Sequence, residues 1–214
     1  MRTAVLISGR GSNLAALIAA CARPGARAEI ALVISNRSDA AGLRHARAAG
    51  ISIATVDHRR FEGREAFDRA LSEELDERQI QLVCLAGFMR VLSGWFAERW
   101  RDRVLNIHPS LLPAFPGLDT HRRALAAGVR FSGCTVHFVR AEVDAGPIIV
   151  QGVVPVRQPD TPERLAARVL QAEHLCYPLA LDLVASGRVR VVDEQVLING
   201  AAAPATILIN PEPE

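Results

Sequence analysis

The sequence predicts an α/β protein built on a doubly wound, mostly parallel sheet of the Rossmann-like kind. Three observations predict this fold: short apolar runs, amphipathic segments that alternate with them, and a glycine-rich turn directly after the first run. Runs rich in branched apolar side chains are typical of strands buried on both faces of a parallel sheet. The expected strands of the first half cover residues 4–7, 30–34, 51–54 and 82–85.

Helices are expected between these strands, over residues 14–20, 40–49 and 64–77. The last segment places Phe67, Leu71 and Leu75 on one face, because residues four apart lie on the same side of a helix. Strand and helix therefore alternate, as a doubly wound sheet requires.

The second half begins with an expected strand over residues 104–107, which enters a loop containing Pro109, Pro113 and Pro116. A loop of this length is a functional candidate. A short helix over residues 121–127 and strands over residues 134–139 and 148–156 follow, and a turn at residues 144–147 splits the two strands.

The longest helix should open at Thr161 and Pro162, because Thr is a good N-cap and Pro suits the first helical position. We expect it to continue past Glu173 until Pro178 bends or ends it. A hairpin should then pair residues 189–192 with residues 195–198. With no repeat or linker to divide the chain, we expect one domain over residues 1–192 whose two halves share one sheet. Residues 193–214 should form a C-terminal extension, a strand plus a flexible tail.

The composition is that of a globular protein without a polymeric partner. Half of the 214 residues are hydrophobic, and 25 basic residues against 23 acidic ones leave a net charge of +2, far from the excess typical of nucleic-acid binding. No apolar run resembles a signal peptide or a membrane span. The sequence therefore predicts a cytoplasmic protein with neither membrane nor nucleic acid as partner, and it makes no prediction of the oligomeric state. The scattered Cys21, Cys84, Cys134 and Cys176 are expected to be buried free thiols.

The glycine turn after the first strand covers residues 8–13, SGRGSN, and leads into a helix. Backbone N–H groups at such a helix start favour an anion. Leu14 breaks the GxGxxG dinucleotide pattern, and no Lys completes a P-loop. Ser12 and Asn13 favour a phosphomonoester as the ligand. The alternative is a turn that only closes a strand–helix unit.

Asn106, His108 and Asp144 are the candidate catalytic residues. Asn106 and His108 stand where the fifth expected strand meets its loop, and ligands of open α/β sheets bind at the carboxyl ends of strands. An amide can donate to a developing oxyanion, and an imidazole can exchange a proton near neutral pH. Asp144 could hold that imidazole and favour its charged form. The alternative is a structural histidine before a proline.

The remaining histidines are His45, His58, His121, His137 and His174. They show no metal-ligand spacing, so we interpret most of them as surface groups or satisfied core groups and expect no catalytic metal.

Four segments resemble one family in order and spacing: SGRGSNL at residues 8–14, NIHPSLLPAFPGLDTHRRAL at 106–125, GCTVHFV at 133–139 and DAGPII at 144–149. This resemblance, which covers roughly residues 2–192, is to the phosphoribosylglycinamide formyltransferases, the folate-dependent glycinamide ribonucleotide transformylases. It implies a formyltransferase fold. It also implies that 10-formyltetrahydrofolate, with no metal, donates a formyl group to the amino group of glycinamide ribonucleotide in de novo purine (IMP) biosynthesis.

The resemblance also implies the roles of individual residues, with Asn106, His108 and Asp144 as the catalytic set. The expected ribonucleotide-binding residues are Gly11, Ser12, Asn13, Leu170, Gln171, Ala172 and Glu173. The expected folate-binding residues are Arg64, Met89, Arg90, Val91, Leu92, Asn106, Arg140, Ala141, Glu142 and Val143. The alternatives are an ordinary core position for Met89 and Leu92 and a solvated one for Arg64 and Glu173.

Two positions depart from the family pattern: Ala114, where relatives often carry a basic residue, and Asp119, where they often carry His. The detailed contacts of the loop at these two positions are therefore not predicted.

Three other functions compete with this interpretation. Methionyl-tRNA formyltransferase and formyltetrahydrofolate deformylase share the Asn, His and Asp arrangement, but carry added domains for which we expect 214 residues to leave no room. A non-catalytic nucleotide-binding module would use only the glycine loop.

Overall fold

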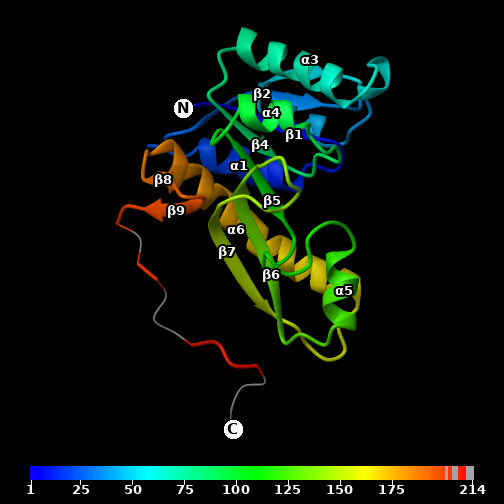
Figure 1. Ribbon diagram of the computed structural model, residues 1–214, viewed down its shortest axis with the longest axis vertical. Coiled ribbons are helices and arrows are strands. Elements are labelled where there is room, and N and C mark those ends of the chain that lie inside the picture. Colours follow the sequence, from blue (N-terminus) through cyan, green and yellow to red (C-terminus); the bar gives the residue numbers. More distant parts are fainter. Residues whose placement is uncertain (201, 204–206, 211–214) are drawn as a thin grey trace.

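The computed structural model describes residues 1–200, 202–203 and 207–210 of the chain. Its main sheet has seven strands in the order β3-β2-β1-β4-β5-β6-β7 (Figure 1). These strands are β1 (Arg2–Ile7), β2 (Glu29–Ser35), β3 (Ser52–Thr55), β4 (Leu82–Leu85), β5 (Val104–His108), β6 (Phe131–Phe138) and β7 (Ile148–Pro155). Strands β1 to β5 pair in parallel, whereas β6 runs antiparallel to β5 and β7 antiparallel to β6. The predicted mostly parallel α/β sheet, shared by both halves of the chain, is confirmed.

Helices cover both faces of this sheet (Figure 1). They are α1 (Ser12–Cys21), α2 (Leu43–Ala48), α3 (Arg64–Glu77), α4 (Gly94–Arg99), α5 (Thr120–Ala126) and α6 (Pro162–Ala185), with a short 3-10 helix η1 (His58–Arg60). The apolar side chains of α1, α2, α5 and α6 form one core cluster, and those of α3 and α4 form another. Alternate residues of β1 serve the two clusters, because successive side chains of a strand point to opposite faces.

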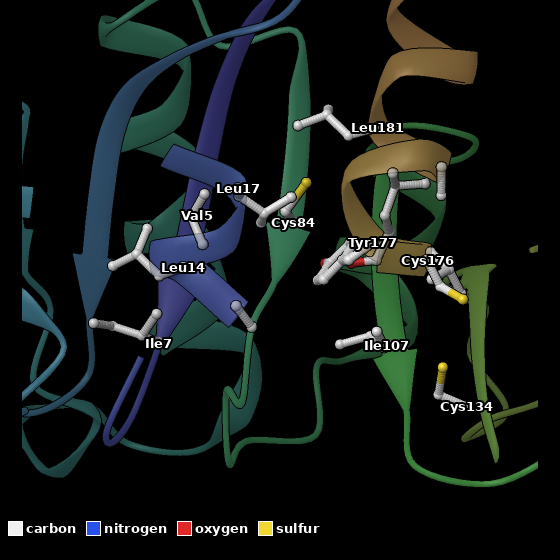
Figure 2. Close-up of a cluster of buried hydrophobic side chains, with 14 of the residues drawn as sticks. Val5, Ile7, Leu14, Leu17, Cys84, Ile107, Cys134, Cys176, Tyr177 and Leu181 are labelled. Carbon is white, nitrogen blue, oxygen red and sulfur yellow. The ribbon is translucent and has the colours of Figure 1, made fainter. Parts of the chain in front are cut away.

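The larger core cluster joins the two halves of the molecule. Leu14 of α1 packs there with Val5 of β1, and Tyr177 of α6 lies against β5 (Figure 2). The hydroxyl of Tyr177 lies within hydrogen-bonding distance of two backbone carbonyls, 3.0 Å from Leu85 O and 3.1 Å from Leu105 O. This buried contact fixes α6 across β4 and β5.

Helix α6 continues past Glu173 as expected and runs through Pro178 to Ala185, so the proline does not end it. A proline inside a helix removes one backbone hydrogen bond. Here the buried Tyr177, Ala180 and Leu181 flank the proline, so packing of this segment against the core outweighs that loss. Helix α4 was not predicted, since its six residues are too few to show a period. Its start is capped by Ser93, whose hydroxyl accepts a hydrogen bond from Phe96 N at 3.3 Å.

The C-terminal hairpin is confirmed: β8 (Val189–Val192) pairs with β9 (Gln195–Ile198) in a separate two-stranded sheet. Val196 and Ile198 of β9 pack against the main core, so the hairpin crosses the expected domain boundary at residue 192. That boundary stays a prediction. The expected flexible tail falls in part on residues 201, 204–206 and 211–214, which lie outside the described residues.

Within the described residues, no helix is both long and apolar enough to cross a membrane. All four cysteines are free; Cys84, Cys134 and Cys176 are buried as expected, and Cys21 is half-buried.

The strand order places a switch point between β1 and β4. From β1 the chain builds outward to β2 and β3, then returns to build β4 and β5 on the other side. Ligands of open α/β sheets bind at the carboxyl ends of the strands at such a point. The glycine turn after β1 and the residues Asn106 and His108 of β5 lie at these strand ends.

Candidate active site

A cavity of about 600 Å³ opens beside the carboxyl ends of β4 and β5. Its wall comes from the segment after β4, from β5, from the loop before α5 and from the segment that joins β6 to β7. The lining residues that sequence analysis singled out are Met89, Arg90, Val91, Leu92, Asn106, His108, Asp119, Arg140, Ala141, Glu142, Val143 and Asp144. Segments far apart in the sequence thus meet at one cavity.

His108 and Asp144 form a buried pair in this wall. His108 Nδ1 lies 3.3 Å from Asp144 Oδ2, and the side chains are 7% and 8% exposed. The other ring nitrogen, Nε2, lies 3.0 Å from the carbonyl oxygen of Phe115. A carbonyl only accepts, so Nε2 carries a proton, and the carboxylate offers an acceptor to a proton on Nδ1. The doubly protonated ring therefore satisfies both of its nitrogens here.

Asp144 also holds the long loop that follows β5. Its Oδ2 accepts a hydrogen bond of 2.8 Å from Gly117 N. The residue adopts a left-handed backbone conformation with φ of 58°, which Asp tolerates better than most residues. The carboxylate thus joins the imidazole to the loop that carries Phe115.

Asn106 is oriented by a histidine that sequence analysis did not select. Its Nδ2 lies 3.2 Å from His137 Nε2, and the two residues face each other in the antiparallel pairing of β5 and β6. His137 Nδ1 lies 2.9 Å from Phe138 O and so carries the proton, leaving Nε2 to accept from the amide. Burial lowers the pKa of His137, which keeps the ring neutral. The amide keeps a second N–H for a ligand.

The interpretation of His137 as a satisfied core group was therefore incomplete. The ring is buried and bonded, but its partner is a candidate catalytic residue. The only sequence signal is its place on an alternating strand, and that signal becomes specific only when the register of β6 against β5 is known.

The glycine turn has the shape expected of an anion site. Gly11 precedes the first residue of α1 with φ of 75°, and a Cβ added there would lie 2.6 Å from Gly42 Cα. Only glycine fits both the conformation and the space. Ser12 opens the helix, two residues earlier than predicted, so its N-terminal N–H groups face the turn.

Asn13 and Glu173 lie together although 160 positions separate them in the sequence. Asn13 Nδ2 donates a hydrogen bond of 2.7 Å to Glu173 Oε2. Both side chains are buried, so the alternative of a solvated Glu173 is wrong. Burial raises the pKa of this carboxyl. Asn13 Oδ1 is buried without a partner among the described residues, which leaves one acceptor for a ligand.

A hydrogen-bond relay joins this turn to the cavity wall. Ser8 Oγ donates to Asn36 Oδ1 at 2.6 Å and accepts from Met89 N at 2.8 Å. Met89 is 68% exposed at the cavity, so the alternative of a core position is wrong for this residue. Leu92 is buried in the core and also lines the cavity.

Some expected binding residues lie outside this cavity wall. Arg64 is exposed at the start of α3, and Gln171 is exposed on α6, where Leu170 and Ala172 are half-buried. The structure does not bring Arg64 into the wall. The binding roles of Arg64, Leu170, Gln171 and Ala172 stay predictions.

The two departures from the family pattern differ in position. Ala114 is exposed and contributes a backbone carbonyl that accepts from Ser110 Oγ at 2.6 Å. Asp119 lines the cavity and pairs with Arg122 at 2.6 Å. Asp119 therefore places a negative charge at the rim. Among residues 1–200, 202–203 and 207–210, no group of three His, Cys, Asp or Glu side chains could hold a metal ion.

The fold and site define a formyl transferase: residues 1–181 match the family model of that description, and the chain belongs to this family. More narrowly, it belongs with the phosphoribosylglycinamide formyltransferases. It is 46% identical to that of Escherichia coli (strain K12) over 95% of this chain and 96% of the relative.

Solved structures agree with this assignment. Glycinamide ribonucleotide transformylase 1 from Symbiobacterium toebii has a TM-score of 0.90 and 49% identity, over 92% of this chain and 93% of that one. Among relatives compared by sequence, the trifunctional purine biosynthetic protein adenosine-3 of Gallus gallus is 53% identical over 89% of this chain. The matched part spans only 19% of the length of that protein. A formyltetrahydrofolate deformylase from Pseudomonas syringae is more distant, with 29% identity over 65% of its chain and a TM-score of 0.84.

Proposed function

We propose that this chain transfers the formyl group of 10-formyltetrahydrofolate to the amino group of glycinamide ribonucleotide, a step of de novo purine (IMP) biosynthesis. The observation that carries the proposal is the meeting of a buried His108–Asp144 pair and an oriented Asn106 amide at one cavity. This combination suits a reaction in which negative charge develops on an oxygen. Relatives named for this reaction support the choice of substrates.

The folate is proposed to occupy the cavity. Exposed apolar side chains surround it, namely Met89, Val91, Leu118 and Val143, and suit a flat heteroaromatic ligand. We assign folate binding to Met89, Arg90, Val91, Leu92, Asn106, Arg140, Ala141, Glu142 and Val143, in accordance with their place in the wall. Arg64, outside the wall, would contact a part of the folate that extends beyond it.

The ribonucleotide is proposed to bind at the glycine turn. Its phosphate would accept hydrogen bonds from N–H groups of Gly11, Ser12 and Asn13 at the start of α1. Glu173 and the neighbouring Leu170, Gln171 and Ala172 would contact the rest of the molecule. Asn13 Oδ1, which has no partner in the part of the chain that the structure describes, supports this assignment, because a buried acceptor without a partner costs stability unless a ligand donor satisfies it.

The reaction begins when the substrate amine attacks the formyl carbon. The free N–H of Asn106 donates to the developing oxyanion, and protonated His108 stabilises it by charge. Both His108 nitrogens lie beside protein acceptors, Asp144 Oδ2 and Phe115 O, which supports the charge role. A proton transfer by His108 requires Nε2 to leave Phe115 O, and a water held by Asp144 is the other route to the leaving folate nitrogen. No covalent intermediate with the protein is needed.

Acceptor specificity tests this function. The protein is mixed with 10-formyltetrahydrofolate and, separately, with glycinamide ribonucleotide, water alone or charged initiator tRNA, while the folate absorbance is followed. The proposal predicts consumption of the donor only with the ribonucleotide. Consumption with water alone would identify a deformylase, and consumption with tRNA a tRNA formyltransferase. Binding of both ligands without consumption would identify a non-catalytic module.

We also propose that the reaction takes place in the cytoplasm and that the partners of the protein are small molecules.

A further inference from the structure

Arg140 follows β6 and begins the segment that closes one side of the cavity. Its guanidinium group is engaged on three sides. Nη2 donates to Asp102 Oδ1 at 2.7 Å, Nε donates to Glu194 Oε2 at 2.5 Å, and Nη1 donates to Val139 O at 3.1 Å. The side chain is only 10% exposed. The group thus faces protein acceptors, and its stem contributes to the cavity wall.

Glu194 reaches Arg140 from the tip of the β8–β9 hairpin and also pairs with Arg101. The hydrogen bond from Arg140 holds the pKa of the Glu194 carboxyl below its ordinary value, so the group is charged at neutral pH. Asp193 and Glu194 both have positive φ, 48° and 57°, a conformation that favours Asn-Gly in two-residue hairpins.

The stem of Arg140 packs against the turn that carries Asp144. A Cβ added at Gly146 would collide with Phe138 O and lie 3.2 Å from Arg140 Cγ. Phe138 N also donates to Pro147 O at 2.9 Å. Arg140 is thus held at its guanidinium end, while its stem lies beside Gly146 at the far end of the segment between β6 and β7.

We propose that Glu194 is a positioning residue of the cavity: through Arg140 it fixes residues 140–143, the wall against which the formyl donor binds. The identity of that donor rests on the proposed function. The C-terminal hairpin thereby becomes part of the active-site architecture, although none of its residues lines the cavity.

The competing role for Arg140 is direct attraction of an anionic part of the folate. The two roles predict opposite effects of Glu194→Gln. Loss of the carboxylate loosens the wall if Arg140 positions it, but releases a cation toward the folate if Arg140 binds directly.

The experiment compares the steady-state kinetics of wild type, Glu194→Gln and Glu98→Gln with both substrates varied. Glu98 is the matched control, because it pairs with Arg101 at 2.9 Å, as Glu194 also does, but does not contact Arg140. For Glu194→Gln we expect the KM for 10-formyltetrahydrofolate to rise about threefold, the scale of an exposed ion pair. The KM for the ribonucleotide and kcat should not change, and Glu98→Gln should match wild type.

Two further variants keep the test decisive. Asp102→Asn removes another partner of Arg140 and should also raise the KM for 10-formyltetrahydrofolate. Glu194→Asp keeps the charge, so its KM for 10-formyltetrahydrofolate should lie between those of wild type and Glu194→Gln. An unchanged or lowered folate KM in Glu194→Gln, or a fall in kcat alone, would overturn the proposal. Failure of the proposed function is a separate result, because it would appear as absence of formyl transfer in the wild-type protein.

Discussion

His108 Nδ1 lies 3.3 Å from Asp144 Oδ2, and the same carboxylate oxygen accepts a hydrogen bond from Gly117 N. One buried carboxylate thus holds the imidazole on β5 and the loop that covers it. Removing its charge should affect chemistry more than binding.

Asp144→Asn retains the size of the side chain but removes the carboxylate charge that lies 3.3 Å from His108 Nδ1. We expect kcat to fall about a hundredfold, the scale seen when an electrostatic contribution to a transition state is lost. The KM values of both substrates should change little. Initial rates at saturating substrates measure the effect, and equal rates for variant and wild type would contradict the assigned role.

His137→Phe removes the acceptor that orients the Asn106 amide. We expect kcat to fall roughly tenfold, because the amide can then rotate away from the oxyanion, a loss of about 1.4 kcal/mol in the transition state. His137→Gln supplies a side-chain oxygen as acceptor and should recover part of the activity. Kinetics of the two variants side by side provide the check; a phenylalanine variant with normal kcat would rule out this orienting role.

Gly11→Ala tests the anion site. The added Cβ would lie 2.6 Å from Gly42 Cα in a backbone with φ of 75°, so the turn must shift. The KM for the ribonucleotide should rise at least about tenfold, as expected when several phosphate hydrogen bonds are misaligned, while the folate KM stays near that of wild type. Gly9→Ala is the matched control, since a Cβ there meets nothing within 4 Å. Equal ribonucleotide KM values for the two variants would place the phosphate elsewhere.

Asp160→Asn tests an acid-sensitive contact near the start of α6. Asp160 accepts from Arg168 at 2.8 and 2.9 Å, and this pairing lowers its pKa from 3.8 to about 2. Because the folded-state pKa is the lower one, the stabilisation is complete above pH 3.8 and disappears as the pH falls toward 2. The melting temperature of the variant should therefore lie below that of wild type at neutral pH, and the two should converge in this acid range. The exposed Asp182→Asn on the same helix serves as control; a difference independent of pH would argue against the ion pair.

The sheet could be predicted from the sequence, because the apolar residues of buried strands and of amphipathic helices recur with different periods. Helix α3 was predicted with its observed bounds, 64–77, since Phe67, Leu71 and Leu75 mark its buried face. The meeting of His108 with Asp144 could be expected from strand ends at one edge of a sheet. In contrast, the His137–Asn106 contact depends on the register between β5 and β6, and the Glu194–Arg140 contact on the placement of a distant hairpin. Local patterns do not specify such pairings. The path of α6 through Pro178 likewise reflects core packing rather than local preference.

We propose that this site places a formyl group on the amine of glycinamide ribonucleotide. The most direct measurement is the mass of the ribonucleotide recovered after incubation with 10-formyltetrahydrofolate and either wild type or His108→Ala. We predict that wild type adds the mass of one carbonyl group, and that His108→Ala leaves the ribonucleotide unchanged over the same time although it binds both substrates. An unchanged ribonucleotide with wild type would show that the site does not formylate this amine, and near-equal conversion by the two proteins would show that His108 is not needed.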